Sequence, residues 1–377
     1  MGERRRPPLG RVALLVPGGV ALVAGLDAAL MLLGLPAPLR WDRLPDVHGV
    51  LLVFGFVGTL VSLERAVALS RVWGFGAPAG LGLGGLLLLS PLPRNAGAAC
   101  LVVGSAVLVA VYVPLWRRQP AAAVLAQAGG AVLATGGALL WFGGVPVPWL
   151  LPWLAGFLVL TIVGERLELA RVAVLSPSAE PLAHVLSAGV VVGALAALLW
   201  PAVGYAVLGL AVVGLCAWLF VFDVARRTIR STGLPRYMAA CLLAGYAWLA
   251  AAGGTWLVRG PLVDGGGYDA VVHGVFLGFV MSMVMAHAPV ILPAVLRRPL
   301  PYHPFMYVPV ALLHGSLALR VVVGDVRGVE VAWQVGGVLN IVSVLLFVAT
   351  AVWSAAAAGT SAPARRAPAV PVVASAA

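Results

Sequence analysis

Apolar stretches of about 20 residues, separated by short segments that carry arginines, recur along nearly the whole chain. A helix of this length crosses the hydrocarbon core of a bilayer, where every backbone polar group has to be satisfied internally. Hydrophobic residues make up 62% of the 377 residues, charged residues only 10%, and the mean hydropathy is +1.05. This balance excludes a soluble globular domain. The sequence therefore predicts an all-α, polytopic integral membrane bundle that lies in a lipid bilayer.

Twelve spanning helices are expected in a single transmembrane domain, residues 11–355. An N-terminal cytoplasmic tail, residues 1–10, precedes this domain, and a disordered tail rich in Ala and Pro, residues 356–377, follows it. The predicted spans are 11–35, 47–69, 74–93, 95–116, 120–144, 147–170, 181–201, 203–224, 236–258, 268–296, 304–324 and 329–355.

The arginines give this count a test, because basic residues gather in cytoplasmic loops. The 24 basic residues fall mostly on the side of both predicted tails. The segments predicted on the opposite side hold Arg40, Arg43, Arg94, Arg259, Arg320 and Arg327. We therefore expect a multi-pass protein of a prokaryotic-type plasma membrane with both termini in the cytoplasm. The net charge of +11 then reflects membrane orientation and does not indicate nucleic-acid binding.

A short pattern recurs in the second, sixth and tenth predicted spans. Gly55-Phe56 and Gly156-Phe157 are each followed, nine residues after the glycine, by a Glu-Arg pair, and Gly278-Phe279 is followed in the same way by His287. Each segment comes four spans after the previous one and runs in the same direction across the membrane. This spacing favours a pseudo-threefold 4+4+4 arrangement of helices.

Two histidines, His48 and His273, begin the second and tenth spans in similar strings, HGVLLVFGF and HGVFLGF. Two imidazoles that face each other across a bundle can hold a haem iron axially. Each would need a partner for its other ring nitrogen. The alternative is a pair of interfacial histidines that bind headgroups or loops.

The twelve spans, the positions of His48 and His273, and residues 273–320 carry a resemblance. The topology resembles the catalytic subunit I of the haem-copper oxidases, and the 273–320 string is similar to the NnrS family, haem-containing membrane proteins linked to nitric oxide metabolism. The resemblance implies that His48 and His273 bind a single haem b as a bis-His pair. It also implies that Arg320 and Arg327 meet the haem propionates, since Arg suits bidentate carboxylate contacts.

The chain departs from the oxidase pattern in its remaining ligands. The sixth span has no histidine, and the tenth has His273 but no second histidine close to it on the outer half. A second haem and its copper partner therefore lack ligands, so a complete oxygen-reducing centre is not expected. Copper could still be bound by Met281, Met285 and His287, but methionine is also an ordinary filler of apolar helices.

Four further residues are candidates for polar or ligand roles within the membrane. Glu64, Glu165 and His287 share the repeat position near the cytoplasmic ends of their spans and form a candidate inner polar cluster that handles protons or ions. Their alternative is that each helix ends at the headgroups, with His287 bonded locally. His314 is a candidate second ligand, or it bonds to a neighbouring group within the bundle.

These patterns predict a b-type haem protein of oxidase-like fold that acts in electron transfer or in nitric oxide metabolism, with a redox partner on the outer side. If it is an enzyme, it is an oxidoreductase. The alternative is a metal-free, proton-coupled transporter that uses Glu64, Glu165 and His287.

Overall fold

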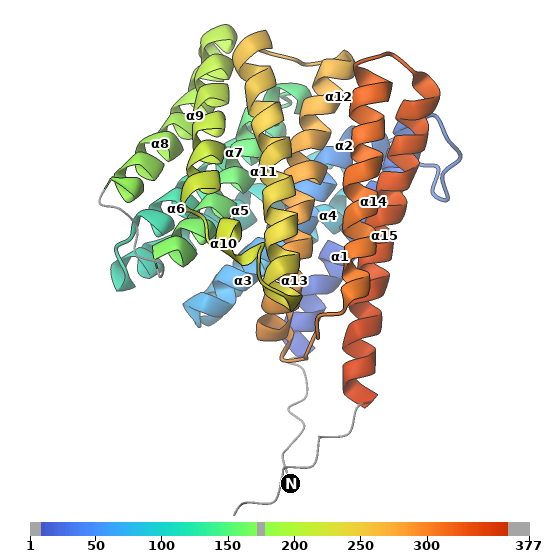
Figure 1. The fold of residues 1–377 in the computed structure, drawn as a ribbon. Helices are drawn as coiled ribbons and strands as arrows, with labels where there is room; N and C mark the ends of the chain where they lie inside the picture. Colours follow the sequence, from blue (N-terminus) through green and yellow to red (C-terminus); the bar gives the residue numbers. More distant parts are fainter. Residues whose placement is uncertain (1–8, 172–177, 361–377) are drawn as a thin grey trace, which may run out of the picture.

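The computed structural model describes residues 9–171 and 178–360, and over these residues it contains helices and no strands (Figure 1). The order of elements is α1 (Leu9–Leu32), α2 (Leu44–Val50), η1 (Leu51–Gly58), α3 (Thr59–Leu69), η2 (Val72–Phe75), α4 (Gly76–Leu88), α5 (Arg94–Arg118), α6 (Ala122–Phe142), α7 (Val147–Arg171), α8 (Ala179–Leu199), α9 (Pro201–Phe222), α10 (Ala225–Thr228), α11 (Gly233–Arg259), α12 (Gly265–His273), η3 (Gly274–Met281), α13 (Ser282–Leu296), η4 (Pro304–Met306), α14 (Tyr307–Ala318), η5 (Leu319–Asp325) and α15 (Glu330–Thr360).

Each predicted span has a counterpart among these helices. Within the described residues, 11 helices are long and apolar enough to cross a membrane, and the expected third span corresponds to the shorter apolar helix Val72–Leu88. That helix ends at Leu88, close to Pro91 and Pro93, because proline removes a backbone donor and restricts the residue before it. The prediction of an all-α, polytopic bundle is confirmed.

The two predicted tails need one correction. Helix α15 continues to Thr360, so residues 356–360 are helical where disorder was predicted. A helix rich in Ala can continue through this segment because Ala has the highest helix propensity. Residues 1–8 and 361–377 lie outside the described part of the chain.

The glycine of the repeated pattern has the same packing role in all three repeats. A Cβ atom added to Gly55 would lie 2.9 Å from Ala21 Cβ in the first span. At Gly156 it would lie 2.5 Å from a methyl carbon of Leu133, in the fifth span, and at Gly278 it would lie 2.4 Å from the ring of Trp248, in the ninth. In each repeat, the second helix therefore approaches the first closely at this glycine. This recurrence supports the 4+4+4 arrangement.

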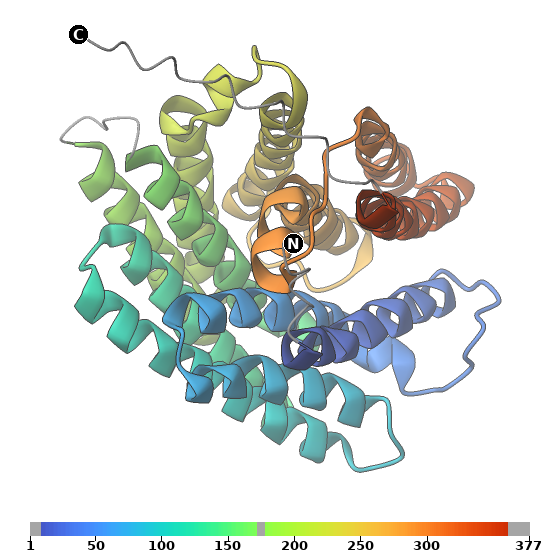
Figure 2. The same ribbon diagram turned by 90° about the horizontal axis from the view of Figure 1, so that it is seen from below.

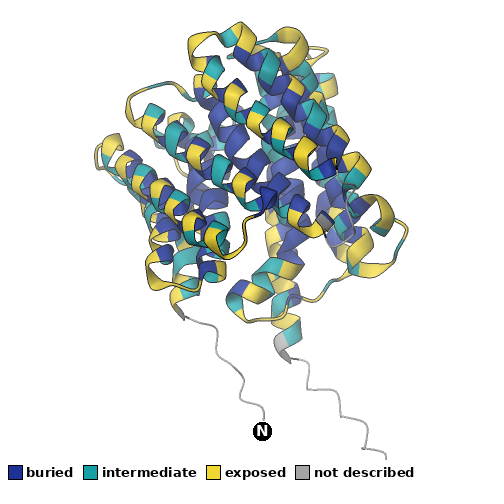
Figure 3. Ribbon diagram, turned by 90° about the vertical axis from the view of Figure 1, so that its left-hand side faces the viewer, coloured by how far each residue is buried: buried dark blue, intermediate teal, exposed yellow. Residues whose placement is uncertain are grey.

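The second, sixth and tenth spans also form the centre of the bundle. Buried residues make up 61% of the most apolar stretch of Leu44–Leu69, 83% of that of Val147–Ala170 and 67% of that of Gly265–Leu296. Among the described residues, no other long span exceeds 50%. The remaining helices surround these three (Figure 2), and α15 packs back against α1. Buried residues gather in the interior of the bundle (Figure 3).

Two sides of the bundle are used as reference below. The terminal side is the end where α1 begins and α15 ends, at the bottom of Figure 1, and the far side is the opposite end, where α2 and α12 lie.

Candidate functional site

A cavity of about 650 Å³ is lined by residues of α2 and α12, the two elements at the far side of the bundle. Its lining comes from α1, from all three central spans, from η5 and α15, and from residues at the far-side ends of α5 and α6. This volume lies within the range of about 300–1,000 Å³ found for small-molecule and cofactor sites. The cavity therefore has the size of a ligand site and lies between the repeats.

His48 and His273 both line this cavity. The Nδ1 atom of His48 lies 2.8 Å from the carbonyl oxygen of Gly25, and that of His273 lies 2.9 Å from the carbonyl oxygen of Asp269. Because a carbonyl only accepts, each Nδ1 carries the proton and donates it, and a neutral ring then has an unprotonated Nε2. No described residue hydrogen-bonds to either Nε2. This is the arrangement of metal-ligating histidines, in which the other ring nitrogen is held by a second group.

Three π-helical segments line the same cavity. Segment η1 begins three residues after His48, η3 begins directly after His273, and η5 includes Arg320. Such segments are rare and often occur at functional sites, because the wider turn displaces side chains from their α-helical positions. Here they contribute apolar side chains to the cavity wall, among them Phe56 and Phe276.

The far-side rim of the cavity is polar. Arg320 forms two hydrogen bonds with Asp269, at 2.8 Å from Nε and 2.7 Å from Nη2, and its guanidinium carbon lies 5.3 Å from the ring centre of Trp333. The carboxylate of Asp269 also lies 3.3 Å from Nδ1 of His273. Arg94, above the ring of Trp141, also lines the cavity. The rim thus brings two guanidinium groups next to an apolar interior.

Arg320 lies close to α15, where two consecutive glycines make room for it. A Cβ atom on Gly336 would lie 2.7 Å from Arg320 Cβ, and one on Gly337 would lie 2.9 Å from its Nη1. By contrast, Arg327 is exposed and does not line the cavity, although it was predicted to act with Arg320.

His314 does not line the cavity, and both of its ring nitrogens are used inside the protein. Trp248 donates to its Nδ1 over 3.1 Å, and its Nε2 lies 3.2 Å from the hydroxyl oxygen of Ser282. Of the two alternatives for this residue, the local hydrogen-bonding role matches the geometry, because no ring nitrogen is left for a metal.

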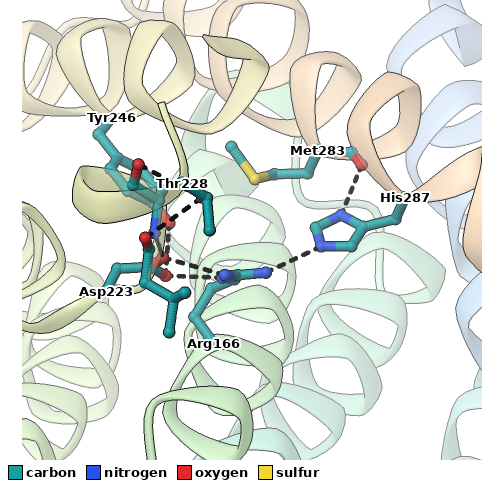
Figure 4. A network of polar contacts seen from close by, with 8 residues as sticks. Arg166, Asp223, Thr228, Tyr246, Met283 and His287 are labelled. Carbon is teal, nitrogen blue, oxygen red and sulfur yellow. Dashed lines mark hydrogen bonds and ion pairs between the residues drawn. The ribbon is translucent and has the colours of Figure 1, made fainter. Parts of the chain in front are cut away.

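The inner candidates lie in a band of polar side chains, which we call the terminal-side belt: Glu64, Arg65, Glu165, Arg166, Asp223 and His287. Arg166 donates to Asp223 from Nε and Nη2, over 2.6 and 2.9 Å, and from Nη1 to Nε2 of His287, over 3.1 Å (Figure 4). His287 Nδ1 in turn lies 2.8 Å from the carbonyl oxygen of Met283. His287 thus contacts an arginine and no glutamate directly.

The two glutamates meet through Arg65, which forms an ion pair with Glu64 and lies 3.6 Å from a carboxylate oxygen of Glu165. Sequence reasoning placed Glu165-Arg166 at the headgroups as one alternative, but Arg166 is buried and paired with Asp223. The three predicted residues therefore do lie in one belt, with arginines between them.

The chain matches one family profile, described as "Domain of unknown function (DUF8744)", over residues 11–356. The chain belongs to this family. The match covers nearly all of the membrane-spanning part of the structure, Gly10 to Ala358. No curated protein matches the sequence of this family member.

Several residues of the site were not predicted. Asp269 had a readable signal, since it stands one helical turn before His273. Arg94 and Trp333 had none, because they come from spans distant in sequence.

The described residues contain no group of three or more His, Cys, Asp or Glu side chains that could hold a metal ion. Met281 lines the cavity, and Met283 packs near Gly245.

Proposed function

We propose that the far-side cavity binds one haem b through His48 and His273 and that the protein transfers electrons through it. The observation that carries this proposal is that two histidines from repeat-related helices line one cavity, each with Nδ1 bonded to a carbonyl oxygen and Nε2 without a described partner. Two imidazoles that would hold one iron need both features.

The rest of the lining fits such a group. The walls next to the histidines are apolar, with Leu52, Phe56 and Phe276, and suit a planar hydrophobic macrocycle. Arg94 and Arg320 lie at the rim, where they can pair with the carboxylates of a haem. Arg320 keeps Nη1 for such a contact, since Nε and Nη2 are held by Asp269.

Each of these residues then has a defined task. A bound haem b supplies an iron that is reversibly reduced by one electron. His48 and His273 would hold such an iron together, and two imidazole ligands from the protein would favour electron transfer over nitric oxide binding. Asp269 orients His273 and makes it a more basic ligand through the Nδ1 contact. The apolar walls exclude water from the site.

The arginine distribution supports an orientation with the terminal side in the cytoplasm. The cavity then lies toward the outer face of a plasma membrane. A redox partner that docks on the outer face would have the shortest path to the haem.

Optical spectroscopy of the purified full-length protein, produced with haem available, tests the proposal. The dithionite-reduced protein should show the sharp α-band of a b-type cytochrome, with about one haem per chain. His48→Ala and His273→Ala should each lose this band. His303→Ala is the matched control and should keep it, because His303 is exposed and lies outside the cavity.

A folded protein without colour would overturn the haem proposal and favour the metal-free transporter instead. A spectrum that both alanine variants keep unchanged would show that a different pair of side chains holds the haem.

A further inference from the structure

Arg65 is the centre of a second polar assembly, separate from the far-side cavity. It contacts Glu64 on its own helix and Glu165 on α7, and its Nη1 donates to the side-chain oxygen of Gln127 on α6 over 3.3 Å. Three helices therefore bring two carboxyl groups, one guanidinium group and one amide group together. Glu64 lies five residues before the end of α3, about 8 Å along the helix, so the assembly is close to the terminal-side surface.

The charges of this assembly do not balance. Two carboxylates face a single guanidinium, which leaves one excess negative charge. The neighbouring Arg166 cannot offset it fully, because it is bound through two hydrogen bonds to its own carboxylate, Asp223. An uncompensated charge within a membrane-spanning domain is expensive.

Arg118 on α5 donates to the carbonyl oxygens of Ala68 and Leu69 at the end of α3, and the remaining titratable neighbours supply no positive charge. His287 accepts from Arg166 at Nε2 and donates from Nδ1 to Met283, so its ring carries one proton and is neutral. Tyr112, on α5, is a neutral phenol within electrostatic range of the assembly, and the exposed Glu168 adds a further negative charge. A proton on one of the two carboxyl groups would remove the imbalance.

Three buried polar atoms around Arg65 have no hydrogen-bond partner among the described residues: Arg65 Nε, Gln127 Nε2 and the Tyr112 hydroxyl. Tyr112 and Gln127 are 2% and 1% exposed. Buried polar groups are nearly always paired with protein or with ordered water, so these atoms indicate a place for water beside the carboxyl groups. The carboxyl side chains themselves are partly accessible, with 23% of Glu64 and 16% of Glu165 exposed.

We propose that Glu64 and Glu165 share one proton next to Arg65 and that the assembly is a proton-binding site supplied by water from the terminal side. In uptake, a carboxylate oxygen accepts a proton from hydronium and leaves neutral water, and release is the reverse step. The ligand is a proton rather than a metal cation. Arg65 contacts both carboxyl groups and repels a metal ion that would have to lie between them, whereas a proton binds to a single carboxylate oxygen. This site does not depend on the far-side cavity or on haem.

Infrared spectroscopy of the full-length protein in lipid nanodiscs tests the proposal. A protonated carboxyl group has a C=O stretching band that is separate from the bands of carboxylates and shifts in D₂O. The native protein at neutral pH should show such a band with the deuterium shift. Glu64→Gln and Glu165→Gln should each lose the intensity of one carboxyl group, because the remaining carboxylate is then balanced by Arg65.

Glu168→Gln is the matched control and should keep the band, since this exposed carboxylate lies on the same helix as Glu165. Gel filtration and circular dichroism identify variants that fail to fold, and either glutamine variant alone decides the question. The proposal is overturned if the native protein has no protonated carboxyl band, or if a folded glutamine variant keeps its full intensity. The infrared test can also be made on a protein without haem. Failure of the haem proposal is therefore distinguishable from failure of the proton-site proposal.

Discussion

The far-side cavity and the terminal-side belt both place histidines from the central spans among polar side chains, but they leave different atoms unused. In the cavity, His48 and His273 each spend one nitrogen on a carbonyl oxygen and have no described partner at the other. In the belt, His287 uses both nitrogens. Within this bundle, a ring nitrogen without a protein partner beside a cavity is therefore a better sign of a candidate ligand site than a histidine in a membrane span alone.

The largest effect is expected from Asp223→Ala, which removes the carboxylate partner of Arg166 in the terminal-side belt. Asp223 accepts two hydrogen bonds from Arg166, one from the Tyr246 hydroxyl and one from the backbone of Ala225. Its removal leaves the buried guanidinium of Arg166 without a carboxylate, which should lower the free energy of unfolding by about 3–5 kcal/mol. The free energy of unfolding in mixed detergent micelles measures this loss.

Glu168→Ala is the control for that measurement, because the side chain is exposed on the neighbouring helix α7. It should change the free energy of unfolding by less than about 0.5 kcal/mol. Equal effects of the two substitutions would show that the Arg166–Asp223 pair does not stabilise the bundle.

The second prediction concerns the haem proposed for the cavity and the side chain that would support it. Asp269→Ala removes the carboxylate that holds both His273 and Arg320. Loss of such a supporting group typically lowers metal affinity about 10–100-fold. We therefore expect haem to pass that much more readily to an acceptor protein, followed by absorbance.

Asp46→Ala is the matched control, since Asp46 lines the same cavity but has no hydrogen bond to either histidine. It should retain haem like the native protein. If both aspartate variants release haem equally, the contact with His273 is not what supports the ligand.

Much of this architecture could be predicted from the sequence because hydropathy and repeat spacing are local signals. The spans follow from apolar length, and the Gly-Phe pattern identified the three helices that prove most buried. His48 and His273 stand out because histidines are rare in apolar spans. Arg320 was assigned to the same site and does line the cavity.

The features that could not be predicted from the sequence depend on contacts between distant segments. Arg166 and Asp223 are 57 residues apart and pair only because α7 and α9 pack together. Nothing in the sequence marks Arg94 as a neighbour of the cavity. The π-helical segments were not predicted either, because apolar length and periodicity do not distinguish i→i+5 from i→i+4 hydrogen bonding.

The third prediction tests the glycine of the repeated pattern in the central spans, which contribute side chains to both the far-side cavity and the terminal-side belt. Gly278→Ala places a Cβ atom 2.4 Å from the Trp248 ring, so α11 and η3 have to separate. Overpacking of this kind costs about 1–3 kcal/mol, measured as the free energy of unfolding in micelles. Gly315→Ala is the control, because a Cβ atom there meets nothing within 4 Å. It should be neutral or slightly stabilising, and a loss as large as that of Gly278→Ala would remove the packing explanation.

The smallest effect is expected from His287→Gln, which is compared with the effect of His273→Ala on the same span. His287→Gln keeps an acceptor for Arg166, which also retains both hydrogen bonds to Asp223. At most, one hydrogen bond to Met283 is lost, which costs about 0.5–1.5 kcal/mol. The haem spectrum should stay unchanged, whereas His273→Ala should abolish it. Loss of colour in His287→Gln would mean that a nitrogen already paired inside the belt holds a ligand, and the distinction between used and unused ring nitrogens would fail.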